Sequence, residues 1–193
     1  MTLRRVVALV CLLNLAYFGI EFSVARRIGS VSLFADSVDF LEDASVNFLI
    51  LAALGWSARA RGRVGMLLAA LILVPGIATL WTAWLKFHHP SAPDAPLLSL
   101  TGLGAMAVNA ACAWMLARHR HTAGSLAKAA FLSARNDVFA NLAIIAAGLV
   151  TYKLPSAWPD LIVGLGVAVL NLDAAREVLE SARAEGRSMP PAA

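Results

Sequence analysis

The sequence of 193 residues contains few charged side chains and almost no cysteine. Charged residues make up 15% of it and hydrophobic residues 60%, whereas soluble domains have roughly 25% and 45–50%. A water-soluble fold is therefore not expected, and at roughly 150 residues per domain there is no room for a large catalytic domain beside the apolar part. Cys11 and Cys112 lie in separate apolar runs, which excludes a disulfide framework and a zinc finger.

The sequence also lacks a basic patch and an enzyme motif. The net charge is +4, but the basic residues are spread between apolar blocks, as loop charges of a membrane protein are, and we expect no nucleic-acid partner. No His-Glu-x-x-His or similar constellation is present, which argues against an intramembrane metalloenzyme. We therefore expect a protein that is not an enzyme and that holds no tightly bound cofactor.

Six long apolar blocks dominate the sequence. A bilayer core is crossed by about 20 apolar residues in a helix, and backbone groups in lipid must be hydrogen-bonded within their own segment, so these blocks predict helices. The expected fold class is all-α, a six-helix transmembrane bundle over residues 1–182 followed by a short polar tail at 183–193. The predicted helices span approximately 6–25, 33–54, 65–85, 97–117, 126–152 and 161–178.

The orientation follows from the charges between the blocks. With a cytoplasmic N-terminus, ten lysine and arginine residues fall on the cytoplasmic side and four on the other, while Lys128 and Arg135 lie inside the fifth block. Because cytoplasmic loops carry the excess of positive charge, we expect both termini in the cytoplasm. The expected location is the plasma membrane, which in a bacterium is the inner membrane.

The second block carries four acids in the run ADSVDFLED at 35–43. At 3.6 residues per turn, three of these acids and one amide fall within an arc of roughly 80°, and Glu42 points away from it. The members of this stripe are Asp36, Asp39, Asp43 and Asn47. Charges at membrane depth are costly and usually face a cavity or a partner, so the stripe indicates an ion or proton path.

The fifth block offers a second polar face. Ser133 and Asp137, spaced i and i+4, share this face with Asn136, and Asn141 follows one turn after Asp137. If the second and fifth blocks pack together, the two polar faces form one site.

Carboxylates in apolar surroundings lower their mutual repulsion by binding protons, a cation or basic side chains. Lys128 and Arg135 are the bases at membrane depth, but both point roughly 160° away from Asp137 on the helix. One interpretation is that the acids pair with these or with loop arginines and hold helices together. A hard or borderline cation between the second and fifth blocks accounts better for the excess of acids.

The run LFADSVDFLED at 33–43 resembles the second helix of the cation diffusion facilitator family, in which an acid or histidine and an aspartate four residues later form half of the transport site. Residues 132–141 resemble the fifth helix of that family, whose His-or-Asp-x-x-x-Asp pair supplies the other half. Weaker similarity occurs in the same order elsewhere, at Asn14, Glu21, 108–109 and 158–160.

The resemblance implies a divalent-metal transporter that exports metal from the cytoplasm in exchange for protons by alternating access. It implies Asp39, Asp43 and Asp137 as metal ligands, with Ser133 at the position where zinc-transporting members have histidine. Such an oxygen-rich set shifts the expectation from zinc toward manganese, iron, cobalt or magnesium, although carboxylates also bind zinc. The sequence does not resolve which of these metals is carried.

Other oxygen-bearing side chains leave alternatives open. Asp36 is a further candidate ligand, but an acid on the exit path and a charge favoured by the helix dipole are alternatives for it. Asn136 is also a candidate metal ligand, and Asn47 or Asn141 could complete the coordination.

The expected partners are divalent metal ions, protons and the lipid bilayer. Members of the resembled family usually append a cytoplasmic domain that binds metal and dimerises, and this sequence ends soon after the sixth block. We therefore expect any homodimer to form through the transmembrane helices. The alternative function is that of a non-transporting membrane protein or degenerate family member whose intramembrane acids are structural.

Overall fold

The computed structural model describes residues 2–53, 58–118 and 124–170, and within these ranges every regular element is a helix. The elements are α1 (Leu3–Ile28), α2 (Val31–Ala53), α3 (Ala58–His88), α4 (Ala95–Ala117) and α5 (Gly124–Lys153), followed by a helix at Trp158–Leu170. The predicted all-helical class is confirmed. The part of the last predicted helix beyond residue 170 and the predicted tail at 183–193 lie outside the described residues.

The observed helices extend beyond the predicted apolar blocks because their polar flanks remain helical. α1 continues to Ile28, where Gly29 adopts a left-handed conformation with φ of 62° and its N–H bonds to the carbonyl of Ala25. α4 begins at Ala95 because Asp94 caps it, accepting a hydrogen bond of 2.9 Å from the Leu97 N–H. The caps, which apolar patterning does not detect, therefore determine these helix ends.

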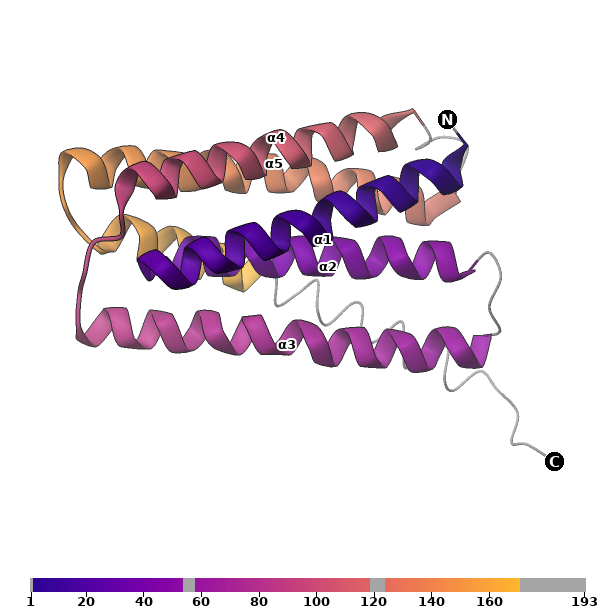
Figure 1. The fold of residues 1–193 in the computed structure, drawn as a ribbon, viewed down its shortest axis with the longest axis horizontal. Helices are drawn as coiled ribbons and strands as arrows, with labels where there is room; N and C mark the ends of the chain where they lie inside the picture. The colour runs from indigo at the N-terminus through magenta and orange to yellow at the C-terminus, as the bar shows by residue number, and fades with distance from the viewer. Residues whose placement is uncertain (1, 54–57, 119–123, 171–193) are drawn as a thin grey trace.

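The helices α1 to α5 run side by side along the long axis of the molecule, and α2 lies in their midst (Figure 1). α2 packs against α1, α3, α4 and α5. From residue 31 to 45 every side chain of α2 is buried except that of Asp39, which is half-buried. The helix that carries the acidic stripe is thus the central helix of the bundle.

The bundle buries polar groups and presents apolar ones. α1 and α4 are long and apolar enough to cross a membrane, by the length and composition of the described residues. Large apolar side chains lie on the outside of the described helices, among them Leu12, Trp81, Leu100, Phe139 and Ile162. Such a distribution suits a protein whose surroundings are lipid, since outward apolar groups cost nothing there while backbone and polar groups must be satisfied inside.

Candidate functional site

Two hydrogen bonds join α2 to α5 and fix how the two helices face each other. The Ser133 hydroxyl donates to Oδ1 of Asp43 at 2.9 Å. Two turns away, Nδ2 of Asn141 lies 3.4 Å from Oδ1 of Asp36. As the residue numbers rise on α5 they fall on α2, so the helices are antiparallel and their polar faces are in register.

This register places Asp39 opposite Asp137. Asp39 lies midway between Asp36 and Asp43, and Asp137 lies midway between Ser133 and Asn141, so the two residues lie at the same level of the contact on its facing sides. Consistent with this placement, Asp137 is one of the acids whose charge acts on Asp39. Asp137 also interacts electrostatically with Asp43. Three of the predicted carboxylates therefore face one region between α2 and α5.

Two amide side chains support this region. Asn47 donates from Nδ2 to the carbonyl of Asp43 at 2.8 Å, and Asn141 donates to the carbonyl of Asp137 at 2.6 Å. The Oδ1 atoms of both asparagines are buried without a hydrogen-bond partner. These two oxygens are thus free to coordinate a cation, which fits the expectation that Asn47 or Asn141 could complete a coordination shell.

The structure does not bring every candidate ligand into the region. Asn136 lies exposed on the bundle surface, where its Oδ1 accepts a hydrogen bond of 3.2 Å from Arg135, itself exposed. Lys128 has no described side chain. Among the side chains that are described, no three of the His, Cys, Asp and Glu types come close enough together to hold a metal ion.

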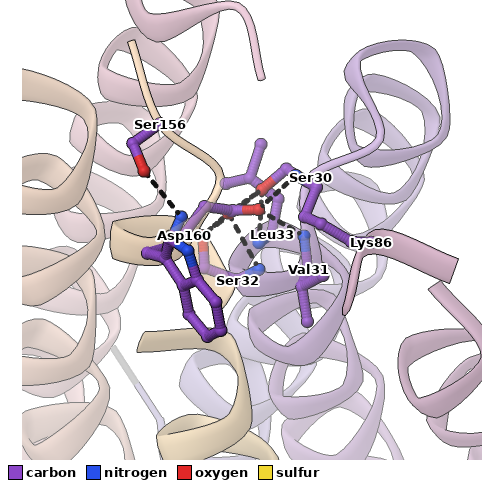
Figure 2. A network of polar contacts seen from close by, with 8 residues as sticks. Ser30, Val31, Ser32, Leu33, Lys86, Ser156 and Asp160 are labelled. Carbon is purple, nitrogen blue, oxygen red and sulfur yellow. Dashed lines mark hydrogen bonds and ion pairs between the residues drawn. The ribbon is translucent and has the colours of Figure 1, made fainter. Parts of the chain in front are cut away.

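A second polar cluster holds the start of α2, and sequence reasoning did not find it (Figure 2). Asp160, in the helix Trp158–Leu170, is completely buried and accepts a hydrogen bond of 2.7 Å from Nζ of Lys86 at the end of α3. It also accepts hydrogen bonds from both serine hydroxyls, Ser30 and Ser32, at 2.6 Å each. We call Ser30, Ser32, Lys86 and Asp160 the Asp160 clasp.

The Asp160 clasp caps α2 with a carboxylate from another helix. The backbone N–H groups of Val31 and Ser32 donate to Asp160 at 2.9 and 3.1 Å. A negative charge at a helix N-terminus is favourable because it satisfies free N–H groups and opposes the helix dipole. The last helix approaches this closely because residue 164 is glycine, where a Cβ would lie 2.6 Å from the Ser32 nitrogen. The serines after Gly29 were the available sequence signal, since serine favours helix starts.

The family model described as the cation efflux transmembrane domain matches residues 7–185. No curated protein matches the chain significantly.

Proposed function

This chain belongs to the cation efflux family, whose transmembrane domain it matches over residues 7–185, and from that membership we propose that it exports a divalent metal cation from the cytoplasm in exchange for protons. Members of this family are membrane proteins that transport cations, and they are not enzymes. The observation that carries the finer proposal is the register of α2 against α5, which sets Asp39 opposite Asp137 and Ser133 against Asp43.

The proposed cargo site consists of Asp39, Asp43 and Asp137, with Ser133 beside Asp43. All four residues lie on the facing sides of α2 and α5. Asp39, Ser133 and Asp137 are half-buried, so a cation entering from solvent would meet them before the buried Asp43. The buried amide oxygen of Asn47 is available to complete the shell. Because this donor set contains only oxygen, we infer a preference for manganese, iron, cobalt or magnesium over zinc.

Proton exchange follows from the ligands themselves. A carboxylate binds a metal only when it is deprotonated, so metal and protons compete for the same oxygens. In the inward-facing state the arriving cation displaces protons, and in the outward-facing state protons displace the cation. A conformational change between these two states then couples the two fluxes in opposite directions.

We further propose that the protein resides in the plasma membrane with both termini in the cytoplasm, and that any homodimer forms through its transmembrane helices. The support for the orientation is the distribution of lysine and arginine, of which ten fall on the proposed cytoplasmic side and four on the other.

The test is flux into liposomes that contain the purified full-length protein. We expect uptake of a divalent cation, from a panel of Mn, Fe, Co, Mg, Cd and Zn, with proton movement in the opposite direction. Asp43→Ala and Asp137→Ala should each abolish both fluxes, whereas Asp94→Asn, at the exposed cap of α4, should leave them unchanged. If both alanine variants transport like the wild type, the site is assigned wrongly.

The competing function is that of a family member without transport activity, in which the acids hold the helices together. The hydrogen bond from Ser133 to Asp43 favours it, because that contact joins α2 to α5 without a metal. This function takes precedence if no divalent cation crosses the membrane under any gradient of metal or pH.

A further inference from the structure

Glu21 of α1 is a buried acid that the proposed cargo site does not use. Its side chain has no exposed surface, and neither carboxylate oxygen has a hydrogen-bond partner. Ring contacts of Tyr17 with Phe40 and of Phe22 with Phe34 bracket Glu21 and set it level with Asp36 where α1 packs on α2. The charged groups around Glu21 are the acids Asp36 and Asp39. Two ionised carboxylates buried side by side repel each other, so this pair needs a positive ligand or a proton.

Asn141 of α5 adds a third side chain to this pair. Its Nδ2 lies 3.4 Å from Oδ1 of Asp36, and its own Oδ1 is buried without a hydrogen-bond donor. Oδ2 of Asp36 is likewise buried and unpartnered. Side chains from three helices thus carry buried oxygens without a hydrogen-bond donor in this neighbourhood, and leaving a buried acceptor unsatisfied is unfavourable.

The nearby bases are engaged elsewhere. Lys86 forms the ion pair with Asp160 at 2.7 Å, and Arg26 and Arg27, one to two turns after Glu21, are exposed on the surface. The described bases therefore leave the negative charge of Glu21 and Asp36 uncompensated.

We propose that Glu21, Asp36 and Asn141 form a second binding site for a divalent cation, one helical turn from the Asp39–Asp137 site on the side of the Asp160 clasp. Two carboxylates balance the charge of one divalent cation, and carboxylate and amide oxygens are the ligands of hard cations such as Mn²⁺. Asp36 precedes Asp39 by one turn and Asn141 follows Asp137 by one turn, so a cation can pass between the two sites along the same pair of helices.

This inference rests on the proposed function, because it takes a divalent cation to be the cargo. The experiment is therefore a binding measurement that is independent of flux: electron paramagnetic resonance of Mn²⁺ titrated into the purified full-length protein in detergent. We expect two Mn²⁺ ions per chain for the wild type and one for Glu21→Gln. Asp36→Asn, which keeps an acceptor for Asn141, should also bind one ion. The double variant Asp43→Asn with Asp137→Asn should retain one ion, held by the second site.

Asp94→Asn is the matched control, since it removes an acid from an exposed helix cap and should leave two ions bound. Thermal unfolding of each variant shows whether it is folded. If Glu21→Gln does not fold, Asp36→Asn provides the test of the second site. The inference is overturned if the wild type binds fewer than two Mn²⁺ ions, or if every folded variant of Glu21 and Asp36 still binds two. In the second outcome the liposome flux can persist, so the failure of the second site would leave the proposed transport function intact.

Discussion

Ser133 links the two halves of the proposed site through a hydroxyl. Its Oγ donates to Asp43 at 2.9 Å, and the resemblance of residues 132–141 to the fifth helix of the family implies histidine at this position in zinc-transporting members. A hydroxyl is a weaker ligand for zinc than an imidazole nitrogen, which is a standard zinc ligand. If the proposed site holds the metal, the identity of this single residue bears on which metal is preferred.

Replacing Ser133 by histidine should shift metal preference toward zinc. The imidazole would supply a nitrogen ligand beside Asp43, so we expect the ratio of Zn²⁺ to Mn²⁺ flux in liposomes to rise about tenfold, which corresponds to about 1.4 kcal/mol. Ser133→Ala is the control for loss of the hydroxyl alone and should not raise that ratio. An unchanged ratio in the histidine variant would place residue 133 outside the coordination shell.

Both side chains of the Lys86–Asp160 ion pair are buried, with relative exposures of 3% and 0%. Removing one partner leaves an uncompensated buried charge, and we expect Lys86→Met to lower the free energy of unfolding by about 3–5 kcal/mol. Combining it with Asp160→Asn should cost less than the sum of the two single changes. Thermal or denaturant unfolding in detergent measures this, and additive effects would contradict a direct pairing.

Sequence reasoning predicted which faces of α2 and α5 are polar. The faces of α2 and α5 follow from helical periodicity, which put Asp36, Asp39 and Asp43 on one stripe and Ser133 with Asp137 on another. Periodicity could not separate Asn136 from that second face, because its side chain lies at the edge of the face and turns to Arg135 on the surface. Nor could it find the partner of Lys86, since residues 86 and 160 are far apart in sequence.

At the scale of the element, helix ends carry information that the apolar pattern does not contain. The six apolar blocks predicted where helices lie, but the bounds depend on single residues such as Gly29 and Asp94. The pairing of helices was likewise only partly predictable. Matching polar faces indicated that α2 meets α5, whereas the burial of α2 between four other helices depends on how the whole bundle packs.

The contact between the last helix and the start of α2 depends on Gly164. A Cβ there would lie 2.6 Å from backbone atoms of α2, so Gly164→Ala must push the helices apart and weaken the Asp160 clasp. We expect a loss of about 1–3 kcal/mol in the free energy of unfolding. Gly166→Ala is the control, because a Cβ at that position meets no atom within 4 Å. Equal unfolding temperatures of the two variants would show that the close approach is not required.

At the scale of the whole molecule, Figure 1 places the N-terminus and the connection between α3 and α4 at opposite ends of the bundle. Thr2, directly before α1, lies at one of these ends, and His89, directly after α3, lies at the other. The charge distribution predicts which end faces the cytoplasm.

Labelling of introduced cysteines decides the orientation. In a variant without Cys11 and Cys112, we expect an impermeant thiol reagent added to intact cells to label His89→Cys and to leave Thr2→Cys unlabelled. The reason is that the end bearing Thr2 carries most of the lysine and arginine and so stays inside. Permeabilised cells should label both variants. Labelling of Thr2→Cys alone in intact cells would reverse the proposed orientation.

The Asp160 clasp also constrains the order in which the chain is completed during synthesis. Ser30 and Asp160 are 130 positions apart, so the start of α2 leaves the ribosome long before its acceptor has been translated. Until then the serine hydroxyls and the first amides of α2 have no carboxylate to meet. The central helix α2 is therefore synthesised early but gains its N-terminal cap late. In a nascent chain stalled before residue 160, the N-terminus of α2 would lack this cap.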